Sequence, residues 1–282
     1  MTDIAIIGAG IAGISAAVTA ASRNKSVMIF DDGNAGGKLN AAHEIKNFPG
    51  FFGKSQEEIR RELDLHLAGM GISVTPKKIT SVYNMGDHFS LISGQEYFEA
   101  KKVILASGIS FGKPLNGENV FLGRGVSCCA TCDGMLYKGK TVAVILYSKK
   151  EEQEVSFLSE ICTKVLLFPM YKDAVNESIL NNPAVEIRSA KNFSISGGMK
   201  ADTLSADGAE FKTDCVFILR ENIPPAQLIS GIEMDGNHVK TDRSMKTNIK
   251  GFFAAGDITG TPYQYAKASG EGNIAALSAC ME

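Results

Sequence analysis

A strand, a glycine-rich turn and a helix follow one another at the N-terminus, and this order constrains the fold more than any other feature of the sequence. The short apolar run 4–7 leads into Gly8-Ala9-Gly10-Ile11-Ala12-Gly13 and then into an alanine-rich stretch with helical periodicity. Gly8 permits the tight turn, Gly10 lets the backbone approach a pyrophosphate, and Gly13 lets the helix pack closely on the strand. Because the N-terminus of a helix attracts anions, we expect a dinucleotide-binding βαβ unit here.

Residues at both ends of the chain indicate which dinucleotide binds. A second apolar strand, 27–30, ends in Asp31, 18 residues beyond Gly13, where a carboxylate can accept hydrogen bonds from both ribose hydroxyls of an adenosine. Near the C-terminus, a strand runs into Gly256-Asp257, and a helix is expected to start near Tyr265. FAD is long enough to reach both ends. We expect Asp257 to accept a hydrogen bond from its ribityl chain and the helix to point its N-terminus at the flavin ring.

Composition bounds the number of domains and the class of partner. A chain of 282 residues with 44% hydrophobic content can bury one large core or two modest ones, and we expect two domains. The net charge of −2 is spread along the chain and favours neither nucleic acid nor an anionic membrane. The uncharged stretch 4–22 contains three glycines, and Met1-Thr2-Asp3 provides no basic n-region. We therefore expect a soluble, cytoplasmic protein.

Further along the chain, two segments have recognisable secondary structure. Residues 55–70 are expected to form a helix that stops at Gly71. Residues 77–102 are expected to form strands with turns at 84–87 and at 93–94.

Several motifs, in order along nearly the whole chain, resemble those of the low-molecular-weight thioredoxin reductases. They are 8–13, Gly36-Gly37-Lys38-Leu39, Asn47-Phe48-Pro49-Gly50, Ala106-Ser107-Gly108, Cys129-Ala130-Thr131-Cys132-Asp133, Ala255-Gly256-Asp257 and Gly270-Glu271-Gly272. The resemblance implies an α/β fold with two Rossmann-like, three-layer (ββα/βαβ) domains of the pyridine nucleotide-disulfide oxidoreductase type. It puts a discontinuous FAD-binding domain at 1–114 and 246–282. An inserted domain at 115–245 would carry the cysteine pair and a degenerate NADPH-binding fold.

The resemblance also implies roles for particular residues and partners. Thioredoxin would be the substrate, and the protein would be a homodimer. Cys132 would face the flavin, Cys129 would attack the disulfide of the partner, and Asp133 would move the proton. The expected contacts with FAD are Gly8, Gly10, Ile11, Ala12, Gly13, Asp31, Gly37, Lys38, Leu39, Asn47, Ala106, Ser107, Gly108, Gly256, Asp257, Tyr265 and Ala266.

The spacing of Cys129 and Cys132 suits a redox disulfide. Two thiols separated by two residues can close a small ring, and a helix start near the first thiol would stabilise its thiolate. A zinc site is the alternative, but the other cysteines lack a second paired spacing and no histidine follows at finger spacing. Cys128 brings the number of cysteines in residues 128–132 to three, but an iron–sulfur cluster would need a fourth thiolate from a distant cysteine. We therefore expect no metal, and we interpret Cys162, Cys215 and Cys280 as small apolar residues.

The expected nicotinamide site lacks its glycine turn. After the strand 141–145 the chain reads Leu146-Tyr147-Ser148-Lys149-Lys150, so that side chains fill the space of a pyrophosphate. The following helix starts with Glu151-Glu152-Gln153-Glu154, which puts carboxylates at the positive end of its dipole. Phe168-Pro169-Met170 replaces the basic cluster that the family uses for NADPH. We predict that NADPH does not bind; a divergent nicotinamide site is the alternative.

Relatives of this compact kind exist that take electrons from reduced ferredoxin, and this sequence is similar to them. The leading hypothesis is therefore a flavoprotein disulfide reductase that passes electrons from ferredoxin through FAD and the cysteine pair to thioredoxin. Three alternatives stay open. They are an NADPH-dependent thioredoxin reductase with a divergent site, a dithiol oxidase that uses oxygen, and a flavin-holding binding protein.

Overall fold

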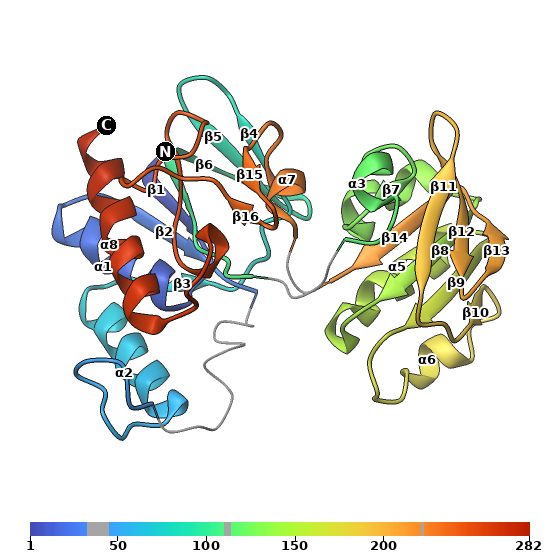
Figure 1. Ribbon diagram of the computed structural model, residues 1–282, viewed down its shortest axis with the longest axis horizontal. Helices are drawn as coiled ribbons and strands as arrows, with labels where there is room; N and C mark the ends of the chain where they lie inside the picture. The colour runs from blue at the N-terminus through green and yellow to red at the C-terminus, as the bar shows by residue number, and fades with distance from the viewer. Residues whose placement is uncertain (33–44, 110–113, 221–222) are drawn as a thin grey trace. The chain divides into compact units, whose positions relative to one another are not determined.

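The computed structural model describes residues 1–32, 45–109, 114–220 and 223–282. The chain forms two compact units (Figure 1). One consists of Met1–Ile109 and Pro224–Glu282, and the other of Ser110–Ile223. The second unit is thus inserted into the first, and each is described below by itself.

The first unit is built on a mixed sheet that is mostly parallel. Within the described residues its strands are β1 (Thr2–Ile7), β2 (Val27–Phe30), β3 (Val74–Thr75), β4 (Ser81–Asn84), β5 (Phe89–Ser93), β6 (Glu96–Leu105) and β17 (Phe252–Ala254). The order is β3-β2-β1-β6-β5-β4, and β17 also pairs with β6. The strands β3, β2, β1, β6 and β17 are parallel, whereas β4 and β5 form the predicted antiparallel excursion. A separate short ribbon is formed by β15 (Met234–Asp235) and β16 (His238–Val239).

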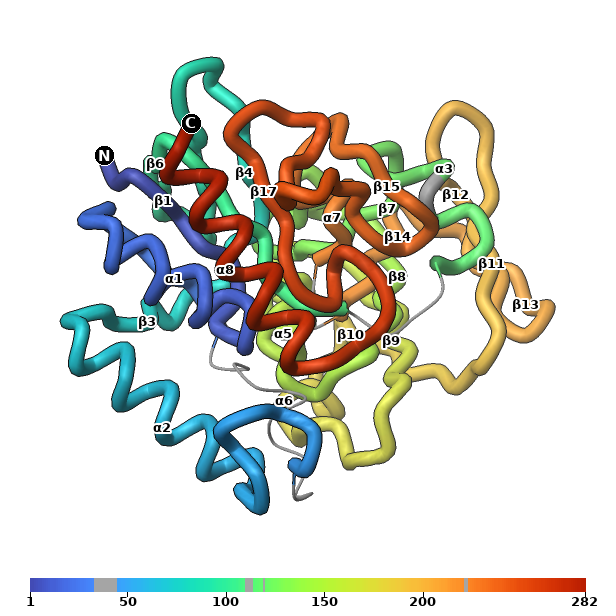
Figure 2. Tube along the Cα trace, turned by 60° about the vertical axis from the view of Figure 1, so that its left-hand side comes forward, coloured from blue at the N-terminus to red at the C-terminus, as the bar shows by residue number. Residues whose placement is uncertain are grey.

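Helices α1 and α8 cover one face of this sheet and pack against each other (Figure 2). The helices of the unit are α1 (Ile11–Ser22), α2 (Gln56–Gly69), α7 (Pro225–Leu228) and α8 (Tyr265–Met281), with the 3-10 turn η3 (Asp257–Thr259). Alternate strand residues, such as Ile4 and Ile6, bury against α1 and α8. The predicted helix 55–70 is observed as α2. It begins with a capping box in which Ser55 and Glu58 exchange hydrogen bonds.

The second unit has three layers: helices, a parallel sheet and a small antiparallel sheet. The parallel sheet is ordered β10-β9-β8-β14-β7, with β7 (Val126–Ser127), β8 (Thr141–Leu146), β9 (Lys164–Pro169), β10 (Val185–Ile187) and β14 (Cys215–Leu219). The antiparallel sheet contains β11 (Phe193–Gly197), β12 (Ala201–Ala206) and β13 (Ala209–Lys212). The helical segments are α3 (Glu118–Phe121), α4 (Ala130–Asp133), η1 (Gly134–Tyr137), η2 (Lys149–Glu151), α5 (Glu152–Ile161) and α6 (Glu177–Leu180).

Strand β8 shows why these layers form. Its residues are almost all buried, and they alternate between two apolar clusters. Val142 and Val144 pack with α5, whereas Ala143 and Ile145 pack with β11 and β12. A strand that is buried on both faces reads as a continuous apolar run, as 141–146 does. The α/β fold class predicted from the sequence is confirmed.

One boundary between the units differs from the expectation. The chain returns to the first unit at Pro224, whereas we expected the return at residue 246. The segment 224–245 belongs to the first unit because α7 contacts β4, and because the Glu233 backbone N–H donates to Asn248 Oδ1 at 2.9 Å. His238 also hydrogen-bonds to the Tyr263 hydroxyl at 2.8 Å. These contacts join residues that are distant in sequence, so no local pattern indicates them.

The crossing of α1 and α8 generates a prediction about stability. A Cβ added at Gly272 would lie 2.1 Å from the carbonyl oxygen of Ala12, whereas one added at the exposed Gly270 would meet nothing within 4 Å. We expect Gly272→Ala to lower the free energy of unfolding by about 1–3 kcal/mol, because the helices must separate. Gly270→Ala in the same helix is the control and should raise it by up to about 1 kcal/mol. Urea titrations of both variants measure the difference; equal midpoints would contradict the close crossing.

Candidate active site

The parallel strands of the first unit end level with one another, and this brings together glycines and acids from distant parts of the sequence. Ile7 is paired with both Phe30 and Leu105, and Leu105 with Ala254. The residues that follow these strands therefore lie at one edge of the sheet, as the carboxyl ends of parallel strands do. They include most of the residues predicted to contact FAD.

The turn after β1 depends on close approach between backbones. Gly8 has a φ of +104°, and a Cβ there would lie 2.4 Å from the carbonyl oxygen of Ala106. A Cβ at Gly13 would lie 1.8 Å from the carbonyl oxygen of Gly8. Only glycine at these two positions allows α1 to pack directly behind the turn.

Among the described residues, no side chain caps the N-terminus of α1. Its N-cap, Gly10, makes no side-chain hydrogen bond, and the first turn contains no acidic residue. A Cβ at Gly10 would meet nothing within 4 Å. Asp31 Oδ2 accepts a hydrogen bond from the Ala9 backbone N–H at 2.8 Å, which puts a carboxylate beside the turn. Backbone N–H groups at a helix start together with this carboxylate suit a pyrophosphate and a ribose.

Side chains from α8 hold the Gly-Asp turn after β17. The Gly256 backbone N–H donates to Glu271 Oε2 at 2.9 Å, and Lys267 Nζ donates to the Gly256 carbonyl at 3.0 Å. Lys267 and Glu271 also form an ion pair at 3.1 Å. Gly256 and Asp257 were predicted from the sequence, whereas Lys267 was not. The spacing of four residues between Lys267 and Glu271 is a signal for such a pair.

Side chains from residues 47–56 contact Gln264 and Tyr265 at the start of α8. Asn47 Nδ2 donates to Gln264 Oε1 at 2.8 Å, and the Tyr265 hydroxyl accepts from Gln56 Nε2 at 3.0 Å. The ring of Phe48 lies 5.9 Å from that of Tyr265. Burial raises the pKa of Tyr265, so its hydroxyl keeps its proton. Sequence reasoning did not identify Gln56 or Gln264.

The other predicted FAD contacts fall into three groups. Ile11 and Ala12 lie in the first turn of α1, and Ala266 lies in the first turn of α8. Ala106, Ser107 and Gly108 directly follow β6. Gly37, Lys38 and Leu39 lie outside the described residues.

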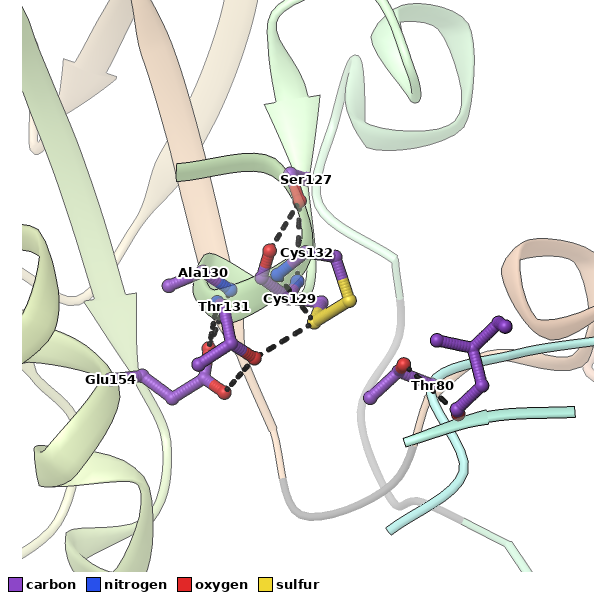
Figure 3. The surroundings of a disulfide bond; sticks show 8 residues. Thr80, Ser127, Cys129, Ala130, Thr131, Cys132 and Glu154 are labelled. Atoms are coloured by element: carbon purple, nitrogen blue, oxygen red, sulfur yellow. Dashed lines mark hydrogen bonds between the residues drawn. A yellow bond between two sulfur atoms is a disulfide. The ribbon is translucent and has the colours of Figure 1, made fainter. Parts of the chain in front are cut away.

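Cys129 and Cys132 form a disulfide in the second unit (Figure 3). Their Cα atoms are 5.3 Å apart. Cys129 is the half-buried N-cap of α4, and its Sγ accepts from the Cys132 backbone N–H at 3.2 Å, whereas Cys132 is exposed. Ser127 Oγ holds the backbone before the turn, because it accepts a hydrogen bond from the Cys129 backbone N–H at 3.2 Å. The predicted redox pair is thus joined and accessible.

The helix after Cys129 is one turn long. It spans four residues, Ala130–Asp133. A helix of one turn has few aligned peptide dipoles, so its macrodipole stabilises a thiolate only weakly. Asp133 ends this helix, and its backbone N–H donates to the Cys129 carbonyl at 3.2 Å. Its proton-transfer role stays a prediction.

The remaining cysteines in the second unit are buried. Burial raises the pKa of Cys215 to about 12 and also raises the pKa of Cys162. Cys128 is 8% exposed and packs with the apolar cluster around β8 and β14. Within the described residues, no group of three or more histidine, cysteine or carboxylate side chains is placed to hold a metal ion.

The turn after β8 in the second unit contrasts with the turn after β1. Its residues are Tyr147 and Ser148, and Ser148 Oγ caps the next short helix by accepting from the Lys150 backbone N–H at 3.3 Å. The guanidinium of Arg220 lies 4.9 Å from the centre of the Tyr147 ring. Arg220 in turn forms a buried, two-pronged ion pair with Glu118, at 2.5 Å and 3.0 Å. Side chains therefore occupy this turn, and the sequence argument did not predict the ion pair.

A cavity of about 590 Å³ lies beside this turn, lined by Tyr147, Ser148, Lys149, Lys150, Glu152, Gln153, Tyr171, Asp173 and Asn176. Glu152 begins α5 and is 3% exposed. Its Oε1 accepts from the Tyr171 hydroxyl at 2.6 Å, and its Oε2 has no hydrogen-bond partner within the described part of the chain. A buried carboxylate at the start of a helix repels a phosphate. The Glu152 carboxylate in this wall thus opposes the binding of a pyrophosphate.

Comparison with known proteins supports one family along the whole length. The sequence profile of the pyridine nucleotide-disulphide oxidoreductases matches residues 2–147 and 148–272. The thioredoxin reductase of Bacillus subtilis (strain 168) is 31% identical, with 98% of this chain and 93% of that protein covered. The chain belongs to the thioredoxin reductase branch of this family.

Two solved structures are more similar still. Both are of a ferredoxin-flavin thioredoxin reductase from Clostridium acetobutylicum. One is 46% identical with a TM-score of 0.86 and covers 99% of this chain and 96% of that one. The other is 44% identical with a TM-score of 0.89 and covers 99% and 97%. These likenesses confirm the predicted family and its class, a flavoprotein disulfide reductase.

The contrast between the cysteines predicts selective alkylation. In the native, reduced protein at pH 8, iodoacetamide should modify the exposed Cys132 and leave Cys215 unmodified, because burial keeps the Cys215 thiol protonated and out of contact with the reagent. Mass spectrometry of tryptic peptides measures the modification of each residue. Urea-unfolded protein is the control, in which both should react. Rapid modification of Cys215 in the folded protein would contradict its burial.

Proposed function

We propose that this enzyme passes electrons from reduced ferredoxin, through bound FAD and the Cys129–Cys132 disulfide, to thioredoxin. One observation carries the proposal: the two units have equivalent strand–turn–helix edges with opposite properties. In the part of the chain that the structure describes, the edge in the first unit has Gly10 at the N-terminus of α1 and glycines at its close contacts. The edge in the second unit is occupied by Tyr147 and by the Glu152 carboxylate. A flavin site without a nicotinamide site calls for a different electron donor.

The residues of the first unit fit FAD. Gly8, Gly10 and Gly13 would let the pyrophosphate approach the start of α1, and Asp31 would bind the ribose of the adenosine. Asp257 would bind the ribityl chain at the turn that Lys267 and Glu271 hold. FAD, when bound, supplies the change from single-electron input to two-electron reduction of a disulfide. Tyr265, which keeps its proton, would offer a hydroxyl near the start of α8.

The cysteine pair would transfer two electrons by thiol–disulfide exchange. With the pair reduced, the Cys129 thiolate attacks one sulfur of the thioredoxin disulfide and releases the other sulfur as a thiolate. The Cys132 thiolate then attacks Cys129 Sγ, which restores the Cys129–Cys132 disulfide and releases thioredoxin as a dithiol. Asp133, next to Cys132, would hold or deliver the proton that a leaving thiolate takes up. Each cycle consumes two electrons, which reduced ferredoxin would supply one at a time.

The donor and the assembly are inferred from similarity. The similar enzyme from Clostridium acetobutylicum is a ferredoxin-flavin thioredoxin reductase. The side chains that occupy the turn after β8 are consistent with such a donor for this protein. By the same family resemblance, we propose that the protein is a homodimer. Among the described residues, no helix has the length and apolar character needed to cross a membrane.

The cavity beside Tyr147 gives a second candidate function some support. Lys149 and Lys150 line it, and a divergent site for NADPH could use such cations. Lys149 Nζ, however, donates to the Ala174 carbonyl at 2.7 Å, and Glu152 opposes an anion. Ferredoxin is therefore the better supported donor.

An anaerobic reduction experiment separates the candidates. The purified flavoprotein is mixed with NADPH, NADH or reduced ferredoxin, and flavin bleaching and thioredoxin thiols are followed. We expect bleaching and thiol formation with ferredoxin and neither with NADPH or NADH. Catalytic bleaching by NADPH would overturn the proposal in favour of the divergent site. In a separate aerobic assay, rapid oxygen uptake with a small dithiol would favour an oxidase. No reduction by any donor would favour a binding protein.

Replacement of Cys132 tests the exchange step. We expect Cys132→Ser to lower thioredoxin reduction on the order of 100-fold or more, because no second thiol can resolve the mixed disulfide. Flavin should stay bound, as its visible absorbance after purification reports, since Cys132 belongs to the second unit. Cys280→Ser, a half-buried cysteine on α8, is the control and should keep its activity. Loss of flavin from the Cys132 variant would contradict the assignment of FAD to the first unit.

A further inference from the structure

The carboxylate of Glu154 holds the redox turn (Figure 3). Glu154 lies in the first turn of α5, and its Oε2 accepts from the Ala130 backbone N–H at 2.5 Å and from the Thr131 backbone N–H at 3.3 Å. Its Oε1 accepts from the Thr131 hydroxyl at 3.2 Å. Ala130 and Thr131 are the two residues between Cys129 and Cys132. One side chain, 24 positions away from Ala130, thus binds the whole loop of the disulfide ring.

The Thr131 hydroxyl connects this carboxylate to sulfur. Thr131 Oγ1 lies 3.4 Å from Cys129 Sγ. A hydroxyl has one hydrogen, and a carboxylate accepts without donating. While Thr131 donates its hydrogen to Glu154, it cannot donate to a thiolate at Cys129, although it can accept from a thiol there. This arrangement therefore favours the protonated form of Cys129 once the disulfide is reduced.

We propose that Glu154 is a positioning residue that anchors the redox turn on α5 and controls the reactivity of Cys129 through Thr131. From the sequence, this carboxylate was expected to repel phosphate. Its hydrogen bonds point instead to the cysteine pair. The proposal rests on the disulfide exchange proposed above, because it concerns how readily that pair gives and accepts electrons.

The charge of Glu154 acts in the same direction as the hydroxyl. A carboxylate near a thiol disfavours the second negative charge of a thiolate, which raises the pKa of the thiol. The Cys132 backbone N–H, which donates to Cys129 Sγ, acts in the opposite direction. Other titratable groups on the elements around the turn include Asp133 on α4, Tyr137 on η1, Cys128 before the turn and Cys215 on β14. Glu154 differs from these because its carboxylate accepts hydrogen bonds from the turn itself.

A protonated Cys129 makes the pair a better electron donor. Reduction of the disulfide adds two electrons and forms two thiol groups, and a stabilised thiolate would favour that reduced state. Glu154 removes part of this stabilisation, so the dithiol gives its electrons to a partner more readily. A dithiol that gives its electrons readily suits a cysteine pair that must reduce another protein.

Three variants separate the anchoring role from the charge. Glu154→Gln keeps the shape of the side chain and an oxygen that can accept from the backbone N–H groups, but it loses the charge. Glu154→Ala loses both. Glu160→Gln removes an exposed carboxylate from the same helix and serves as the control. Each full-length protein is reduced without oxygen and alkylated with iodoacetamide across a pH series.

The readout is the alkylation of Cys129 in the tryptic peptide 125–138, resolved from Cys128 and Cys132 by fragmentation. We expect Glu154→Gln and Glu154→Ala to raise the rate at pH 7 by about 3- to 10-fold, and the pH profile to move to lower pH. In equilibrium with dithiothreitol, both should also be reduced at about 3- to 10-fold lower ratios of dithiol to disulfide. Glu160→Gln should match the unaltered protein. Coincident pH profiles for all four proteins would overturn the control of Cys129.

Hydrogen exchange tests the anchor separately. Backbone protection in the peptide 125–138 should fall in Glu154→Ala and be retained in Glu154→Gln, because the amide oxygen still accepts from Ala130 and Thr131. Unchanged protection in Glu154→Ala would overturn the anchoring role. None of these measurements needs ferredoxin or thioredoxin, so failure of this proposal is distinct from failure of the proposed function.

Discussion

The close approach of backbones at Gly8, Gly13 and Ala106 is the contact on which the first unit depends. A side chain at either glycine would collide with a carbonyl oxygen, so α1 could not lie against β1 and β6. Because the strands end level, the same approach brings Asp31 and Gly256 to one edge. Packing and the ligand site are therefore consequences of the same contacts. This explains why the N-terminal motif carries so much information about the whole unit.

The second unit repeats this topology with different side chains at the equivalent edge. The backbone course is similar, since β8, β9 and β14 are parallel and α5 follows β8. Tyr147 and Glu152, however, replace the open turn and the uncapped helix start of the first unit. A fold supplies the place for a ligand, and the residues at that place decide what binds.

The start of α5 has two features that belong together. Glu152 makes it unfavourable for phosphate, and Glu154, two residues later, binds the loop between the cysteines. A helix start that does not bind a nucleotide can instead offer its carboxylates to the redox turn. On this interpretation, the carboxylate that opposes a phosphate and the properties of the disulfide have a common structural origin.

The sequence by itself determined the strand–turn–helix units, the cysteine pair and most of the residues at the edge of the first sheet, because each depends on neighbours a few positions apart. The interpretation of Glu154 as a barrier to phosphate missed its contact with Ala130, and the return of the chain at Pro224 was expected 22 residues later, at 246. The ion pair of Glu118 and Arg220 links residues 102 positions apart. Only the tertiary structure decided these features, because burial and hydrogen bonding between distant segments leave no periodic or local pattern in a sequence.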